Sequence, residues 1–118
     1  MCIRDRVVEV DDQQVLATFD GPARAIRAAC AIRAFAQRIH ISVHSGLHTG
    51  ECDVIGARVG GLAIDIARSV SARSSPDEIL VSSTVKDLVA GAGIRFSDRG
   101  SQTLPGRLGE WRLYSVDQ

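Results

Sequence analysis

The chain has few of the residues that build disulfide-rich domains or base-stacking surfaces. Its 118 residues include three cysteines, three phenylalanines, one tyrosine and one tryptophan. An odd number of cysteines without a CxxC pair argues against a disulfide framework and against a zinc knuckle. A sheet that binds RNA stacks bases on aromatic side chains, so the shortage of aromatic residues argues against that function as well.

The sequence also lacks an apolar run long enough to cross a bilayer, and we expect no signal peptide. Its 14 basic residues balance its 14 acidic residues, which disfavours a protein that binds nucleic acid or an anionic membrane. We therefore expect a cytoplasmic protein in a reducing compartment. Cys30 is expected to be a small buried thiol within an alanine-rich helix.

The residues that are present suit one folded domain. Hydrophobic residues make up 45% of the chain, which is enough for a core. The first six residues, MCIRDR, carry three charges and no periodic pattern, so we expect residues 1–6 to be a leader that is not native. Residues 7–118 would then be part of a larger domain whose N-terminal portion is missing.

Hydrophobic periodicity predicts strands that alternate with helices. Strands are expected at 7–10, 15–19, 39–45, 52–55, 79–81, 94–96 and 110–116, helices at 23–39, 62–72 and 83–89, and a loop at 56–61. Ser82 or Ser83 can cap the third helix. This order predicts an α+β fold in which helices cover one face of an antiparallel-rich sheet.

Apolar residues at steps of three and four define one buried stripe on each of the two longer helices. The predicted stripe of the first helix comprises Ala25, Ala28, Ala29, Ile32, Phe35, Ala36 and Ile39. The predicted stripe of the second helix comprises Leu62, Ile66 and Val70. Both helices should pack on the sheet through these residues.

Four stretches together resemble one family. They are LATFDGPARAI, GLHTGE, the pattern of VGGLAIDIARSVSA, and the segment from PDEILVSSTVKDLVAGAGIRFSDRG through GEWRLYSV. In this order and spacing they are similar to the catalytic domain of class III nucleotidyl cyclases, of the bacterial adenylate cyclase type. The resemblance covers residue 7 to the C-terminus and implies a C-terminal fragment of that domain. It also implies a ferredoxin-like fold, used as a head-to-tail dimer with active sites between the subunits.

The resemblance further implies a reaction. In the family, the 3′-hydroxyl of ATP or GTP attacks the α-phosphorus and pyrophosphate leaves. Two metal ions, Mg²⁺ or Mn²⁺, activate the hydroxyl and neutralise phosphate charge. Two aspartates hold the metals, a lysine and an aspartate read the purine, an asparagine orients the nucleotide, and an arginine stabilises the transition state.

The metal positions of the family are poorly matched here. The segment that carries the first metal aspartate would precede Met1. The second metal position falls on Gln13, whose neutral amide supplies no charge to a hard dication. Asp12 is one residue away and is the candidate metal ligand of this chain, although ordinary turn chemistry is the favoured interpretation of Asp11 and Asp12. Tight binding of Mg²⁺ or Mn²⁺ is therefore not expected.

The nucleotide positions are also altered. Glu9 and Arg58 stand at the purine-reading positions with reversed charge, and they could pair with each other instead. Asp65 stands at the asparagine position and Ser69 at the arginine position. Being four apart on a helix, these two should face the same side, away from the apolar stripe. Arg68, beside them, is expected to pair with Asp65 or with solvent.

Three histidines, His40, His44 and His48, are four apart and would suggest a metal stripe on a helix. Because the segment is predicted to be a strand, a metal site there is disfavoured.

From the missing and altered family positions we predict a cyclase homology domain that is inactive by itself. The alternative is a non-catalytic module that regulates a cyclase assembly, as a homodimer or paired with another cyclase domain.

Overall fold

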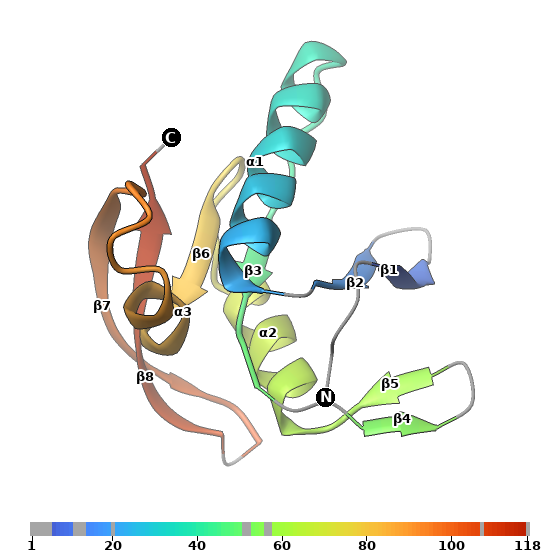
Figure 1. The fold of residues 1–118 in the computed structure, drawn as a ribbon, viewed down its shortest axis with the longest axis vertical. Helices are drawn as coiled ribbons and strands as arrows, with labels where there is room; N and C mark the ends of the chain where they lie inside the picture. Colours follow the sequence, from blue (N-terminus) through green and yellow to red (C-terminus); the bar gives the residue numbers. More distant parts are fainter. Residues whose placement is uncertain are drawn as a thin grey trace.

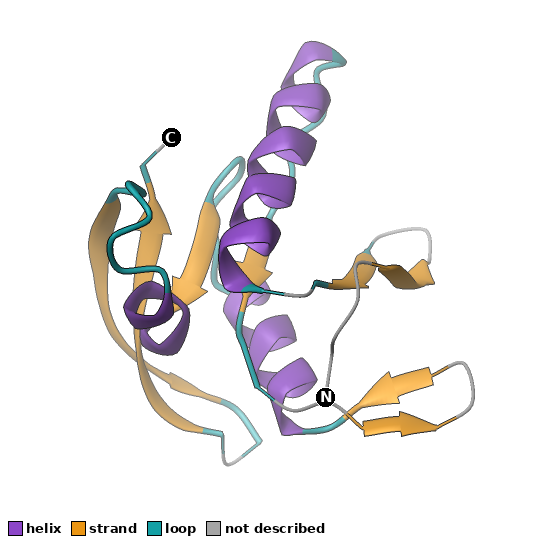
Figure 2. Ribbon diagram, viewed as in Figure 1, coloured by secondary structure: helices purple, strands orange, loops and turns teal. Residues whose placement is uncertain are grey.

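The computed structural model describes residues 6–10, 14–19, 21–50, 53–55, 58–106 and 108–117. Eight strands and three helices occur in these ranges (Figures 1 and 2). In chain order they are β1 (Arg6–Val10), β2 (Val15–Thr18), α1 (Pro22–Arg38), β3 (Ser45–Leu47), β4 (Asp53–Ile55), β5 (Arg58–Gly60), α2 (Leu62–Ala72), β6 (Ile79–Ser82), α3 (Ser83–Leu88), β7 (Phe96–Leu104) and β8 (Gly109–Val116).

The main sheet has four strands in the order β3-β6-β8-β7. β3 runs parallel to β6, whereas β8 is antiparallel to both β6 and β7. β1 with β2 and β4 with β5 form two separate antiparallel pairs, which lie apart from the main sheet in Figure 1. The predicted α+β class with an antiparallel-rich sheet is confirmed.

Both faces of the main sheet carry a hydrophobic core. On β6, Ile79 and Val81 pack in a cluster with residues of α1 and α3. Leu80 packs in a second cluster, with residues of α2 and with Leu113 of β8. Because successive strand residues point to opposite faces, α2 lies on the face opposite α1 and α3. The prediction that all helices cover one face is therefore wrong.

Helix α1 buries only part of the predicted stripe. Pro22 at its first turn has a fixed φ that suits a helix start. Ile26, Ala29 and Ala36 are buried, but Ile32, Phe35 and Ile39 are about half to two-thirds exposed. In Figure 1 the C-terminal half of α1 extends past the main sheet. For them the prediction of burial is wrong.

The chain leaves α1 through a Schellman motif rather than a strand. His40 has a left-handed φ of 60°. The N–H of His40 donates to the carbonyl of Gln37 at 3.2 Å, and the N–H of Ile41 donates to that of Ala36 at 2.8 Å. This motif closes the helix and turns the backbone. The strand predicted at 39–45 is thus wrong, and the observed strand begins only at Ser45.

Two further element predictions need correction. The predicted loop at 56–61 contains β5, which pairs with β4. The strand predicted at 94–96 instead begins at Phe96 and continues to Leu104, where a Pro-Gly turn leads to β8. In contrast, α2 spans the predicted range of 62–72.

Among the described helices, none has both the length and the apolarity that a bilayer span requires.

Helix α2 approaches β3 very closely at one point. Gly46, in the middle of β3, lies against the backbone of Ser71 near the end of α2. A Cβ atom at position 46 would overlap the nitrogen and Cα of Ser71. The small residue at Gly46 therefore sets how near α2 lies to the sheet.

Candidate functional site

The outer face of α2 carries the two residues predicted at the catalytic positions. The helix starts after Gly61, whose carbonyl accepts hydrogen bonds from the N–H groups of Ile64 and Asp65 at 3.2 Å each. Asp65 is exposed and Ser69 is half-buried, whereas Ile66 and Val70 are buried. Asp65 and Ser69 therefore face away from Ile66 and Val70, as predicted, but not away from Leu62, the first residue of the predicted stripe.

The predicted buried stripe of α2 is wrong at its first residue. Leu62 is 64% exposed, and Ala63 and Ile64 are buried in its place. Leu62 stands three residues before Asp65, so an apolar side chain and a carboxylate share the exposed surface near the helix start. This surface is open to a ligand or to another protein.

A small cleft lies beside Ser69. It has a volume of about 210 Å³ and is lined by Arg68, Ser69, Ala72, Arg73 and Pro105. Pro105 belongs to the turn between β7 and β8, so this turn forms the wall opposite α2. Two guanidinium groups and a hydroxyl at one cleft are suited to oxyanions, since arginine forms paired hydrogen bonds to carboxylate or phosphate.

Arg73 is fixed at this cleft by the β7 end of the turn. Its Nη2 donates a hydrogen bond to the carbonyl of Thr103 at 2.8 Å. Its Nε is buried and has no partner among the described residues. A buried N–H without an acceptor is unfavourable, and a bound oxyanion would remove that penalty. Sequence reasoning did not find Arg73, although its position four residues after Ser69 was a usable signal.

The remaining predicted positions are only partly described. Glu9 lies in β1 and Arg58 in β5, and these two strands contact each other. The side chains of Glu9 and Arg58, and all of Asp12 and Gln13, lie outside what the structure describes. The Glu9–Arg58 ion pair and the metal ligand at Asp12 therefore stay predictions.

The described residues do not offer a donor set that fits a divalent cation. No three histidine, cysteine, aspartate or glutamate side chains gather within the described ranges. Two of the three histidines have different hydrogen-bond partners. The His44 Nδ1–H donates to the Ser74 carbonyl at 2.9 Å, and His48 Nδ1 bonds Oγ of Ser82.

His48 forms a hydrogen bond with a buried serine. It follows β3, and its Nδ1 shares a 2.7 Å hydrogen bond with Oγ of Ser82. Ser82 is fully buried and precedes α3, but its side chain does not cap that helix. The His48 ring meets Trp111 edge to face, with 5.0 Å between centroids. Burial lowers the pKa of His48 below its ordinary value of 6.5.

The lowered pKa of His48 predicts acid destabilisation. The unfolded chain takes up the proton more readily than the folded protein, so this contribution is complete above pH 6.5 and is lost as the pH falls below it. We expect the free energy of unfolding, measured with urea at about pH 7.5 and about pH 5.5, to fall less in His48→Asn than in the unmodified chain. His40→Asn, at an exposed position, is the control and should keep the full dependence. An unchanged pH dependence in His48→Asn would contradict the assignment.

Comparison with known proteins identifies the fold. No protein-family model matches the chain, and no curated protein matches it by sequence. Among solved structures, the chain is similar to an adenylate/guanylate cyclase/hydrolase from Silicibacter pomeroyi, with a TM-score of 0.80 and 24% identity over 97% of this chain and 73% of that one. It is also similar to the adenylyl cyclase CyaB from P. aeruginosa, with a TM-score of 0.59 and 14% identity over 97% and 72%. The chain therefore has a nucleotidyl cyclase-like fold.

Proposed function

We propose that the chain is a class III nucleotidyl cyclase homology domain that does not convert nucleotide by itself. The observation that carries this proposal is the outer face of α2, where Asp65 and Ser69 stand beside an arginine-lined cleft within a cyclase-like fold. The family reaction is the conversion of ATP to cyclic AMP and pyrophosphate. We propose a cytoplasmic setting in which cyclic-nucleotide signalling takes place.

The chemistry of α2 argues against turnover. At the position of an amide that orients the nucleotide, Asp65 presents a negative charge, which repels a triphosphate. Ser69 is neutral and cannot replace a fixed guanidinium. Loss of one group that stabilises transition-state charge costs about 10² to 10³ in kcat. A divalent cation, Mg²⁺ or Mn²⁺, would neutralise phosphate charge if bound, but Gln13 replaces one family ligand.

This site can bind phosphate even where it does not catalyse cyclisation. Arg68 and Arg73 line the cleft next to Ser69, and the orphaned Nε–H of Arg73 can donate to an oxyanion. These arginines lie one residue before and four residues after Ser69, so they are offset from the position of the family arginine. They can hold a phosphate without reaching the α-phosphorus in the family geometry. We therefore propose that nucleotide binds weakly and is not cyclised.

The test combines turnover and binding. Purified chain incubated with ATP or GTP and Mn²⁺ should release no cyclic nucleotide, measured by chromatography and mass spectrometry. A fluorescent ATP analogue should bind, and Arg73→Gln should weaken its binding by roughly tenfold, the scale of one charged hydrogen bond. Arg38→Gln, on α1 and away from the cleft, is the matched control and should bind normally. Turnover at the rate of an active cyclase would refute the proposed inactivity.

A second candidate function is pairing with another cyclase subunit. The specific observation is that Leu62 exposes an apolar side chain beside Asp65, on the surface where the family forms its shared site. An exposed leucine at such a surface suits a protein contact better than solvent. The turnover assay also tests this role: added chain should change the rate of an active bacterial homologue, and Leu62→Ser should weaken the effect. An unchanged rate with no complex on gel filtration would exclude pairing with that homologue.

A further inference from the structure

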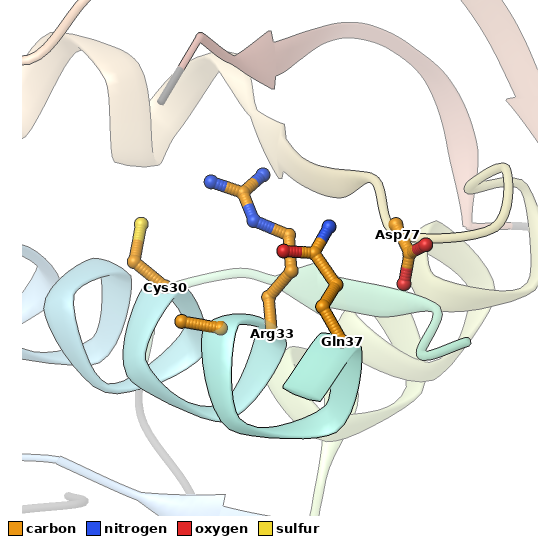
Figure 3. A pocket seen from close by; sticks show the side chains of 5 residues that line it. Cys30, Arg33, Gln37 and Asp77 are labelled. Atoms are coloured by element: carbon orange, nitrogen blue, oxygen red, sulfur yellow. The ribbon is translucent and has the colours of Figure 1, made fainter. Parts of the chain in front are cut away.

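A second, larger cleft shares no lining residue with the cleft at Ser69. It has a volume of about 410 Å³ and is lined by Cys30, Arg33, Ala34, Gln37 and Asp77. Four of these residues come from α1 and one from the turn before β6, as Figure 3 shows. This volume is within the range of sites that hold small molecules.

One wall of this cleft presents hydrogen-bond donors. Arg33 and Gln37 are four residues apart on α1, so they lie on the same side of the helix. In Figure 3 the guanidinium of Arg33 and the amide of Gln37 both project into the cleft. Within the described ranges Arg33 has no carboxylate partner. A guanidinium fork with a neighbouring amide suits a carboxylate, which can accept two hydrogen bonds from the fork.

The opposite wall presents one fixed carboxylate. Asp77 has a left-handed φ of 62°, and its N–H donates to the Val43 carbonyl at 2.8 Å. In return, the N–H of Val43 donates to Oδ1 of Asp77 at 3.3 Å. The first bond fixes the backbone at Asp77, and the second orients its side chain. No described residue bonds its Oδ2, which can accept a hydrogen bond from a ligand.

The turn that carries Asp77 is itself braced. The neighbouring Glu78 accepts a hydrogen bond from the N–H of Ser75 at 2.8 Å and forms an ion pair with Arg99 of β7. The cleft is therefore bounded by a long helix on one side and by a tied turn on the other. Pre-formed walls reduce the ordering cost of binding.

We propose that this cleft binds a small zwitterion of the amino-acid class. The ligand carboxylate bonds Arg33 and Gln37, and the ligand ammonium faces Asp77. Opposite charges on the two walls favour a molecule that carries both charges. A plain anion meets repulsion from Asp77, and a plain cation meets repulsion from Arg33. This site does not depend on the proposed cyclase homology.

Cys30 supplies a direct readout, because its thiol lines the cleft (Figure 3). In a Cys2→Ser/Cys52→Ser background, Cys30 is the remaining cysteine. The labelling rate of this thiol by a chromogenic disulfide reagent is then measured with three probes of matched size. L-norvaline is a zwitterion, pentanoate lacks the ammonium group, and butylamine lacks the carboxylate.

We expect L-norvaline to slow labelling and the other two probes to leave the rate unchanged. Arg33→Gln should weaken protection by roughly tenfold, the scale of a lost charged hydrogen bond. Asp77→Asn should abolish the preference for L-norvaline over pentanoate while its side-chain oxygen keeps the bond to Val43. Arg38→Gln, at an exposed position on the same helix, should protect as well as the background.

Three results would overturn the proposal. The first is an absence of protection by L-norvaline, which is the result expected if Arg33 and Asp77 pair across the cleft in solution. The second is equal protection by pentanoate, which would make the site a general anion site. The third is protection that survives in Arg33→Gln, which would place the probe elsewhere. Circular dichroism melting of each variant separates loss of binding from loss of folding.

Discussion

Replacing Gly46 with alanine is expected to lower the free energy of unfolding by about 3 kcal/mol or more, at the upper end of overpacking effects. The added Cβ would overlap the backbone nitrogen and Cα of Ser71. A flexible side chain could move aside, but helix backbone cannot, so α2 would have to shift away from β3. Urea unfolding followed by circular dichroism measures the change.

Two control variants make the Gly46→Ala result specific. Ser45→Ala changes the neighbouring position of β3 and should cost little. Ser71→Gly combined with Gly46→Ala should not restore stability, because the overlap is with backbone atoms that glycine keeps. Recovery in the double variant would show that the side chain of Ser71 causes the overlap. Near-normal stability of Gly46→Ala would show that α2 lies farther from β3.

The second large effect is expected at Leu113. This residue of β8 is fully buried, in the cluster with Leu80 and with Val70 of α2. Leu113→Ala removes three methylene-sized groups and leaves a cavity between the sheet and α2. Such substitutions cost about 2–5 kcal/mol. Urea unfolding should show a lower midpoint with a similar slope.

Leu88→Ala is the matched control for Leu113→Ala. Leu88 lies at the end of α3 and is 60% exposed, so the same change in chemistry should cost well under 1 kcal/mol. Equal losses in the two variants would contradict the difference in burial between Leu113 and Leu88.

Local sequence signals predicted the elements that are buried along their length. The range of α2 was predictable because Gly60 and Gly61 precede its apolar periodicity. Residues 79–81 were predictable as a strand because a short apolar run follows a turn. The exposure of the Phe35 side chain was not predictable, because its helix extends beyond the sheet and periodicity does not measure how far the sheet reaches.

In the candidate site, too, some features were predictable from local sequence and others were not. The shared orientation of Asp65 and Ser69 follows from helical spacing alone and was predictable. The position of Arg73 at the cleft depends on Thr103 and Pro105, about thirty residues later in the chain. Likewise, Ser82 was one of two serines expected to cap α3, but its hydroxyl bonds His48 instead. Contacts between distant segments decided both outcomes, and local patterns contain no information on them.

The place of β8 in the sheet has a consequence for how the chain folds as it is synthesised. β8 lies between β6 and β7, yet it leaves the ribosome after both of them and after β3. Until β8 arrives, β6 has a partner on one side only, and the buried surface contributed by Leu113 is absent. Nascent chains that end before β8 should therefore remain open and accessible to chaperones and proteases, and protection should appear in one step once β8 emerges.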